Sequence, residues 1–587
     1  MLLLLSLPIL ALTSSIPDSI PILPNPIPNS NSSCYCLPQD PCWPSLKQWS
    51  QFNHTIAGAL IATIPLASPC HSHSPFTPYN AAQCAAIRNN WPLPSTHYKT
   101  SSSIMAPFFA NQSCDPFLPA SSRCILGTYV AYAVRVSSPS TIKATLAFAR
   151  THNIRLVIRN TGHDYLGKST GAGALAIWTH HLSNITVHKT YHSGQYTGPA
   201  LTVGAGVQVY AAAEAAHSHN LVVVGANAVT AGLAGGYSQG GGHSQLTSTF
   251  GLAADQVLHW EVVLPETGQL VTAAPTGPHA DLYWALCGGG GGVHAIVVSM
   301  TVKAHPELRT ASANLSFVGG GVSFRRGVDA FVKTLPCLLD ARCVVVWLLA
   351  DGLFSVTPVT LPAGDKESLG RLMGGVVETL KRENVSYSYY INDFPTYHES
   401  FNTMSPPLNI TEYNIGGRLI PRSVVEFNAS AFTDTLWDIV RQGGVISGIT
   451  VNATLHNHDS NGRKKVENAV LPAWRTAAAN IVVALPFNYT SQSTNLAHQS
   501  LITHTFLPAL DRLLVSPSTG APVAAAAYLN EANFREPHWQ SVFYGSNYPR
   551  LLAIKNKYDP RGVLYAATGV GSEAWVVEES DGRLCRV

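Results

Sequence analysis

The alternation of apolar and polar positions is clearest between residues 129 and 159. Residues 129–136 alternate with the two-residue period of a strand, and residues 154–159 do so again, because Ile154, Leu156 and Ile158 are separated by Arg155 and Val157. Between the two segments Ser138-Pro139-Ser140 is a typical helix start, followed by the apolar stripe Ile142, Leu146 and Ala149. This pattern predicts a strand, a helix and a second strand in a right-handed crossover, whose next loop lies at the edge where ligands usually bind.

The loop after the second strand is the most informative stretch. From Ile154 to Gly173 the chain reads IRLVIRNTGHDYLGKSTGAG, with a single histidine, His163, in its polar part. Backbone N–H groups at the end of a strand can bind phosphate, so the loop suits a phosphate-bearing cofactor. The usual dinucleotide fingerprint is absent, which disfavours a Rossmann domain. The alternative is a surface loop with a solvated histidine.

Two further segments are rich in glycine. Val222–Asp255 reads VVVGANAVTAGLAGGYSQGGGHSQLTSTFGLAAD, and Asp281–Met300 reads DLYWALCGGGGGVHAIVVSM. Glycine lets the backbone approach a ligand closely and lets N–H groups converge on anionic oxygens. A flexible surface loop is the alternative for the first segment, but apolar residues such as Leu233 and Leu252 disfavour it.

Together with the stretch YLNEANFREPHWQSVFYGSNYPRLLAIKNKYDP (Tyr528–Pro560), these motifs resemble the berberine-bridge-enzyme-like oxidases of the vanillyl-alcohol-oxidase superfamily. The resemblance is strong over about residues 120–305 and 525–575 and weak between them. It implies an α+β fold, in which a two-part PCMH-type FAD-binding domain is joined to a substrate domain with an antiparallel sheet backed by helices. It also implies covalent FAD, 8α-linked to a ring nitrogen of His163. The other cofactor-binding residues that it implies are Arg159, Asn160, Thr161, Gly162, Asp164, Gly167, Ala228, Thr230, Gly232, Gly235, Gly236, Gly240, Gly241, Gly242, His243 and Asn547.

The chain departs from the family pattern in two places. Many members carry a cysteine bonded to flavin C6 within Cys-Pro-Thr-Val-Gly, whereas this chain has Ala228-Val229-Thr230-Ala231-Gly232. We therefore expect the second, cysteinyl link to be absent. The family more often has an aromatic residue and then glycine where this chain has His294 and Ala295, which we interpret as a local packing variation.

Three residues near the C-terminus are candidates for proton transfer. Tyr528 and Glu531 are expected at the end of a strand that enters the active site, and Tyr548 follows Asn547, whose family equivalent lies beside the flavin. A carboxylate in a partly apolar pocket can act as acid or base. A structural hydrogen bond is the alternative for each residue. Beyond them a helical stripe, Leu551, Ile554 and Tyr558, is expected to end at Asp559-Pro560.

Composition divides the rest of the chain. We interpret residues 1–15 as a signal peptide, because their apolar run is too short to span a bilayer, and residues 16–33 as a flexible leader. The expected units after these are a cysteine-rich N-terminal arm (34–124), the FAD-binding domain (125–306), the substrate domain (307–524) and the berberine-bridge-like C-terminal segment (525–587). Two helices are expected in the substrate domain, near Arg326–Asp340 and Lys366–Asn384.

Cysteines and glycosylation sequons favour a secreted protein. Seven of the eleven cysteines lie in the first 124 residues, where disulfides are the natural interpretation and zinc is disfavoured because no CxxC pair occurs. Their pairing cannot be deduced; Cys337 and Cys343 are close enough in sequence to pair, and Cys287 and Cys585 stay unassigned. Sequons for N-glycosylation occur at Asn31, Asn53, Asn111, Asn184, Asn314, Asn384, Asn409, Asn428, Asn452 and Asn488.

Charge argues against some partners. Charged residues make up only 12% of the chain, against a usual ~25%, and the net charge is +3 without a basic stripe. Nucleic-acid binding therefore has no support, and no second apolar stretch is long enough to be a membrane anchor.

The resemblance implies an FAD-linked oxidase that acts on a small alcohol or a secondary-metabolite intermediate. A base removes a proton, hydride passes to FAD, and O2 reoxidises the flavin. The likeness is greatest to secreted fungal members, including isoamyl-alcohol-oxidase-like proteins. Two alternatives stay open: a redox-neutral double-bond isomerase, in which Glu531 supplies the acid, and a secreted binding glycoprotein with an inactive flavin fold.

Overall fold

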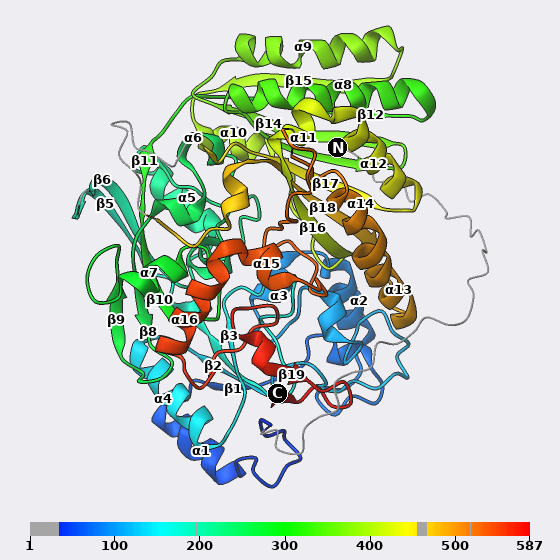
Figure 1. Cartoon of the computed structure of the whole chain (residues 1–587). Coiled ribbons are helices and arrows are strands. Elements are labelled where there is room, and N and C mark those ends of the chain that lie inside the picture. Colours follow the sequence, from blue (N-terminus) through cyan, green and yellow to red (C-terminus); the bar gives the residue numbers. More distant parts are fainter. Residues whose placement is uncertain (1–33, 195, 455–466, 517) are drawn as a thin grey trace.

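The computed structural model describes residues 34–194, 196–454, 467–516 and 518–587. The predicted signal peptide, the leader and the Asn31 sequon lie outside the described residues. Figure 1 shows the helices and strands between β12 (Thr310–Val318) and β18 (Ala477–Pro486) at the top, with the N-terminal arm and the C-terminal segment close together below them.

The predicted strand, helix and strand around residue 140 are confirmed. They are β2 (Tyr132–Arg135), α4 (Pro139–Thr151) and β3 (Leu156–Arg159). The hydroxyl of Ser138 accepts a hydrogen bond from the Thr141 N–H group, as an N-cap should. The four-stranded sheet has the order β1 (Leu60–Ala62), β2, β4 (Leu175–Trp178) and β3, so β4 lies between β2 and β3 and runs parallel to both. β3 is thus an edge strand, and His163 follows its carboxyl end.

A second sheet carries the glycine-rich segments. Its five strands are antiparallel, in the order β5 (Ile185–Ser193), β6 (Tyr196–Gly204), β10 (Ile296–Lys303), β8 (Val257–Val263) and β9 (Leu270–Ala273). Helix α5 (Val209–His217) connects β6 to the first glycine-rich segment, and α7 (Ala280–Leu286) precedes the second. The apolar residues of both helices join one buried cluster with the strands.

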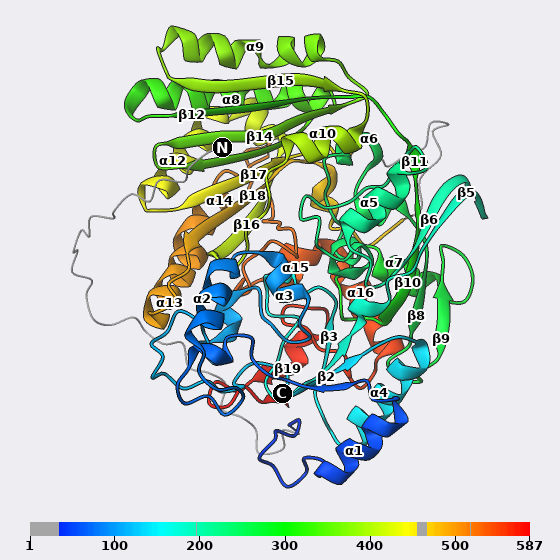
Figure 2. The same ribbon diagram turned by 180° about the vertical axis from the view of Figure 1, so that it is seen from behind.

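The substrate region contains the expected antiparallel sheet. Its seven strands have the order β15 (Tyr387–Phe394), β12 (Thr310–Val318), β14 (Leu353–Pro362), β13 (Val344–Ala350), β17 (Val445–Thr450), β18 (Ala477–Pro486) and β16 (Tyr413–Pro421). The two predicted helices are confirmed as α8 (Gly321–Asp340) and α9 (Lys366–Arg382). In α9 the buried residues Leu369, Met373, Val376 and Leu380 repeat every three or four positions. They pack into one core cluster with residues of α8 and the sheet. Figures 1 and 2 show both helices along the outer side of this sheet.

The C-terminal segment packs back on residues 125–306, the part of the chain that is predicted to bind FAD. Helix α16 (Tyr548–Tyr558) buries the predicted stripe of Leu551, Ile554 and Tyr558 and contacts α7. The strand expected at Tyr528 and Glu531 is absent. The segment runs extended beside β16 with one bond, from the Leu419 N–H to the Ala526 carbonyl, and it then turns because the Glu531 N–H bonds to the Tyr528 carbonyl at 2.9 Å.

Four disulfides are formed among the described cysteines: Cys34–Cys585, Cys36–Cys42, Cys70–Cys84 and Cys114–Cys124. The suggested pairing of Cys337 with Cys343 is wrong, since both thiols are free. Cys337 is exposed on α8, whereas Cys343 is buried in the core of the substrate region, so the two side chains face opposite environments.

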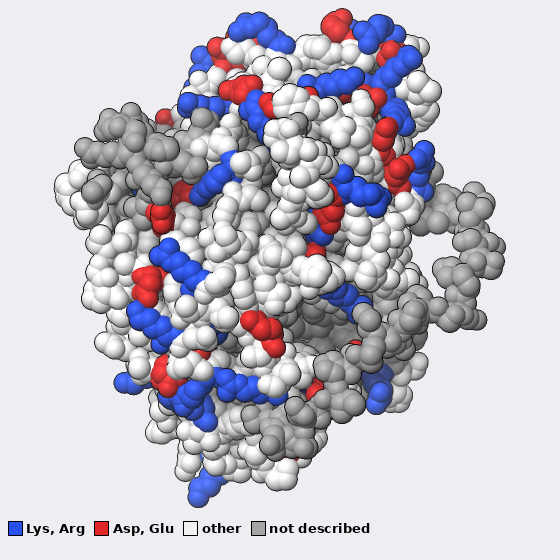
Figure 3. Space-filling view, in the orientation of Figure 1, with Lys and Arg blue, Asp and Glu red and all other residues white. Residues whose placement is uncertain are grey.

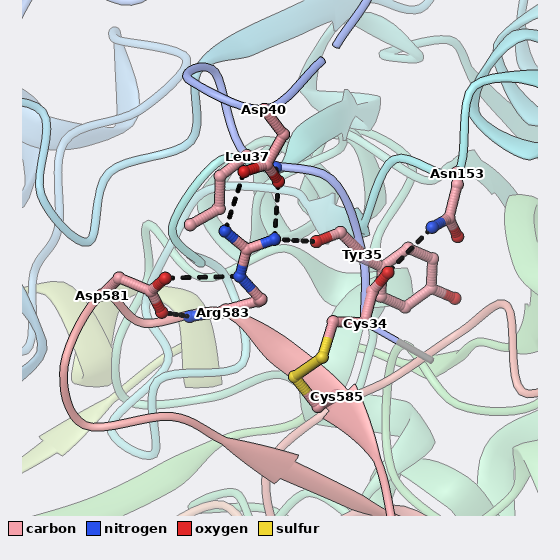
Figure 4. The surroundings of a disulfide bond; sticks show 8 residues. All are labelled: Cys34, Tyr35, Leu37, Asp40, Asn153, Asp581, Arg583 and Cys585. Carbon is pink, nitrogen blue, oxygen red and sulfur yellow. Dashed lines mark hydrogen bonds and ion pairs between the residues drawn. A yellow bond between two sulfur atoms is a disulfide. The ribbon is translucent and has the colours of Figure 1, made fainter. Parts of the chain in front are cut away.

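The two ends of the described chain are tied together (Figure 4). Beside the Cys34–Cys585 disulfide, the Arg583 guanidinium donates to both carboxylate oxygens of Asp40, at 2.5 and 3.0 Å. The Asn153 amide donates to the Cys34 carbonyl at 2.8 Å. Because Asn153 lies just before β3, both chain ends meet at the amino end of the strand that leads to His163.

Surface charge is sparse and mixed. On the face in Figure 3, Lys and Arg side chains alternate with Asp and Glu side chains, and large areas carry neither. Among the residues that the structure describes, no helix is both long and apolar enough to cross a membrane.

Candidate flavin site

The His163 loop is shaped by its own residues. The buried Asp164 carboxylate accepts hydrogen bonds from the N–H groups of Leu166 (3.1 Å), Lys168 and Ser169 (3.3 Å). Gly162 adopts φ +88°, and a Cβ there would lie 2.7 Å from the Arg159 guanidinium. The loop therefore requires glycine at position 162. The hydrogen bonds of the Asp164 carboxylate stabilise the loop itself, so Asp164 has a structural role there that needs no ligand.

Thr230 holds the imidazole of His163. The Nε2 atom of His163 lies 2.6 Å from Oγ1 of Thr230. The Thr230 carbonyl accepts a bond from Gln208 Nε2 at 2.8 Å, and the neighbouring carbonyls of Val229 and Ala231 accept the first N–H groups of α5. A helix start leaves such N–H groups without intrahelical partners, so α5 anchors the Thr230 segment.

The environment of His163 keeps its imidazole neutral. Burial lowers the pKa of His163 to about 4, and the nearby His97 and Arg159 add to this shift. A neutral imidazole has a free ring lone pair at neutral pH, which a nucleophilic attachment to a flavin needs.

The two predicted parts of the cofactor site meet at Asn160. Its Nδ2 atom donates to the Ala205 carbonyl at 2.5 Å, and a Cβ at Gly232 or Gly235 would lie 2.3 or 3.0 Å from that atom. A Cβ at Gly236 would meet nothing within 4 Å. The glycines thus bring the second segment against the His163 loop and leave open space beside Gly236.

Arg159 is a buried cation suited to a phosphate. Its side chain is 1% exposed, its Nε atom has no partner, and its guanidinium donates only to the His97 carbonyl, at 3.3 Å, among the described residues. Burial lowers the pKa of Arg159 to about 10, so it stays charged at neutral pH. A buried, unpaired charge is costly unless a ligand compensates it, and the diphosphate of FAD would do so. The residues present therefore fit the cofactor that the loop motif implies.

Glu531 is the centre of a polar cluster. Its Oε1 atom lies 3.1 Å from Nε2 of His243, and its Oε2 atom accepts a bond from Asn480 Nδ2 at 2.6 Å. The His243 ring packs against Trp474 and Tyr528, with centroid distances of 6.2 and 5.4 Å, and these two rings contact each other at 5.4 Å. Two donors therefore hold the Glu531 carboxylate in one orientation.

Tyr528 joins the Glu531 turn to the glycine-rich segment. Asn530 Nδ2 donates to the Tyr528 hydroxyl at 2.8 Å and to the Gly236 carbonyl at 2.9 Å. Burial raises the pKa of Tyr528 well above its usual value, so the phenol stays protonated and can donate a hydrogen bond. Gly241 and Gly242, both with positive φ, carry the chain past this ring to His243.

Tyr548 and Asn547 lie in other surroundings. The Tyr548 hydroxyl bonds to Glu573 at 2.5 Å, and Asn547 Nδ2 donates to the Ala469 and Val470 carbonyls at 3.1 and 3.2 Å. The structure thus brings together Glu531, Tyr528 and His243 but places Tyr548 in a separate cluster.

Sequence reasoning missed Asn480 and Trp474. Asn480 interrupts the apolar run AAANIVVAL of β18, and such a buried amide is a signal that could have been used. Trp474 lies in a short 3-10 turn (Pro472–Arg475) without any such signal. His294, in contrast, is fully buried beside Gly289.

Comparison with known proteins gives a consistent result. The family model described as FAD binding domain matches residues 130–274, and the one described as berberine and berberine like matches residues 527–571. The FAD-linked oxidoreductase sor8 of Hypocrea jecorina is 46% identical over 560 residues, which cover 95% of this chain and 94% of the relative. The bifunctional decalin synthase calF of Penicillium decumbens is 37% identical over 575 residues, with 95% and 96% covered. The crystal structure of the VAO-type flavoprotein MtVAO615 from Myceliophthora thermophila superimposes with a TM-score of 0.87 at 36% identity, covering 94% of this chain and all of that one.

Proposed function

The chain belongs to the berberine-bridge-enzyme-like FAD-linked oxidoreductases of the vanillyl-alcohol-oxidase type, and from this premise we propose that it oxidises a small alcohol or a secondary-metabolite intermediate with covalently bound FAD. We propose His163 as the attachment residue and O2 as the final electron acceptor. When bound, FAD accepts a hydride and passes the electrons on.

The contact between His163 and Thr230 carries this proposal. Thr230 engages Nε2 of a half-buried imidazole whose pKa is lowered to about 4 by desolvation. A neutral ring held in one orientation supports attachment, and the open space beside Gly236 lies on the segment that follows Thr230. Arg159 supports the phosphate end of the same cofactor.

The residues around Glu531 support the proton transfer. The Glu531 carboxylate takes the hydroxyl proton of the substrate, while His243 and Asn480 keep its two oxygens oriented. Tyr528, protonated because of its burial, donates a hydrogen bond to the oxygen of the substrate. Trp474 and Tyr528 belong to the buried apolar cluster beside His243 and cover one side of this place.

A redox-neutral isomerase is the second candidate. Glu531 contacts His243, an imidazole that can pass a proton in either direction, and a relative at 37% identity carries the name bifunctional decalin synthase. In that case Glu531 protonates one end of a double bond, a proton returns to the Glu531 carboxylate from the carbon beside the other end, the double bond forms again there, and no hydride leaves the substrate.

We further propose that the protein acts in the secretory pathway or outside the cell. Three of the four disulfides lie within the N-terminal arm, and such bonds persist in oxidising compartments.

Screening with the purified yellow protein tests the proposal. Alcohols and unsaturated acids are supplied, and peroxide, flavin bleaching and product structure are followed together. Peroxide with an oxidised product supports the oxidase, whereas an isomer without bleaching supports the second candidate. Neither product from a flavin-loaded protein would contradict both.

A further inference from the structure

The N-terminal arm reaches the edge of the candidate flavin site. The short 3-10 helix Pro107–Ala110 places Phe109 against the His163 loop, where a Cβ at Gly167 would lie 2.4 Å from the Phe109 ring. The Phe109 carbonyl accepts a bond from Thr128 Oγ1 at 2.6 Å, and Thr170 Oγ1 donates to the Thr128 carbonyl at 2.8 Å. The Cys114–Cys124 disulfide closes the chain between these contacts. The arm is thus fixed to the loop that holds His163.

The Glu531 turn meets the arm at the same place. The ring of Phe534, three residues beyond Glu531, lies 4.9 Å from that of Phe108 and 4.8 Å from that of Phe109. Asn533 bonds to Thr503 at 2.8 Å. The His163 loop touches this turn as well, through Lys168 Nζ and the Leu529 carbonyl at 3.5 Å. All three segments therefore converge on one partly exposed aromatic surface.

Arg535 lies over this surface and forms no ion pair within 4.0 Å with any of the described residues. Its guanidinium carbon is 5.7 Å from the centre of the Phe108 ring and 5.5 Å from that of Phe534. Its backbone N–H bonds to Asn533, but its side chain makes no hydrogen bond or ion pair among the described residues. Partial burial lowers the pKa of Arg535, and the charge of Glu579 opposes this shift. A guanidinium in a protein stays charged at all ordinary pH values, so a cation on aromatic rings is left available.

We propose that Phe108, Phe534 and Arg535 form the recognition site for a substrate that carries a carboxylate on a planar, unsaturated body. The guanidinium fork matches a carboxylate in two parallel hydrogen bonds, and the phenylalanine rings pack against the unsaturated part. The acidic group then lies at the rim while the rest of the molecule reaches toward Glu531. This inference rests on the proposed function and specifies its substrate class.

Ligand binding to the flavin-loaded protein tests the inference without turnover. Benzoate is titrated while the flavin absorbance spectrum is recorded, with benzamide as the neutral probe of equal size. We expect the dissociation constant read from the spectral change to be at least 10-fold lower for benzoate than for benzamide. Arg535→Gln should remove that preference, and Arg535→Lys should keep part of it. Phe108→Ala should weaken the binding of both probes.

The matched control is Arg371→Gln, because Arg371 is an exposed residue of α9 and, within the described part of the chain, its side chain donates a hydrogen bond only to Ser368. It should leave both titrations unchanged. Equal affinity for benzoate and benzamide in the parent protein would overturn the inference, as would an unchanged benzoate preference in Arg535→Gln that retains its flavin. Peroxide release is measured separately: turnover of a neutral alcohol without benzoate binding contradicts only the carboxylate site, whereas benzoate binding without any product contradicts only the proposed function.

Discussion

The Nε2 atom of His163 lies 2.6 Å from the hydroxyl of Thr230, although the two residues are 67 positions apart. Thr230 is itself fixed by Gln208 at the start of α5. The helix start, the glycine-rich segment and the His163 loop therefore act together to orient one ring nitrogen. We propose that flavin attachment depends on this contact as well as on the histidine.

Removal of the Thr230 hydroxyl should slow flavin attachment. Thr230→Val keeps the shape of the side chain but loses a hydrogen bond worth about 1 kcal/mol, so we expect attachment to be roughly 5-fold slower. Thr230→Ser should behave like the parent protein. The measurement is flavin fluorescence of the denatured polypeptide at timed intervals after FAD is added to apoprotein. Equal rates in all three proteins would show that Thr230 has no orienting role.

Glu531→Gln should lower turnover without loss of flavin. The substitution keeps the size and removes the proton acceptor, so turnover should fall on the order of 10²-fold or more. Glu573→Gln is the matched control, because Glu573 bonds to Tyr548 in the separate cluster. If the control loses activity and Glu531→Gln does not, proton transfer belongs to the Tyr548 cluster instead.

Ala228→Cys should create a second covalent link to the flavin. Ala228 lies two residues before Thr230 in the same anchored segment, at the position where many members of the family carry a flavin-bonded cysteine. In a protein that also carries His163→Ala, the new cysteine should restore covalent flavin. Peptide mass spectrometry decides the matter: a flavin never found on the peptide with residue 228 means that this segment takes another path past the ring.

Stability should fall as the pH drops from about 6.5 to 4. Burial lowers the pKa of His97 to about 4 and that of His294 to about 3. As the pH falls, the unfolded chain therefore takes up these protons before the folded chain does. Each histidine thus contributes about 3 kcal/mol to the free energy of unfolding above pH 6.5, and this contribution is lost toward pH 4. Asp115 opposes this, because burial raises its pKa to about 6 and its contribution is lost as the pH rises. Thermal unfolding should show a net loss toward acid pH, with a flatter curve for His294→Leu; an equally steep curve would contradict the assignment to His294.

Local patterns explain the part of the structure that the sequence predicted. The strand before His163, the helix start at Ser138 and the buried stripes of α9 and α16 all depend on residues within a few positions of one another. The His163 loop was informative for the same reason, since Gly162 needs its positive φ wherever the loop is placed.

Long-range contacts explain what the sequence did not predict. Asn480 reaches Glu531 from 51 positions away, and His243 does so from 288. The Cys34–Cys585 disulfide joins residues 551 positions apart, so no spacing rule could identify it. The strand expected at Tyr528 does not form, because the chain turns at Glu531 and its backbone groups there bond within the turn instead of to a neighbouring strand.

The most direct test of the account is the covalent state of FAD on His163. The purified protein is denatured in acid and digested, and its peptides are examined by mass spectrometry beside those of His163→Ala. We predict that FAD remains on the peptide that contains His163, and that the His163→Ala protein releases all of its flavin on denaturation. Flavin that stays bound to the His163→Ala polypeptide, or a flavin-free His163 peptide from a fully loaded protein, would contradict the account.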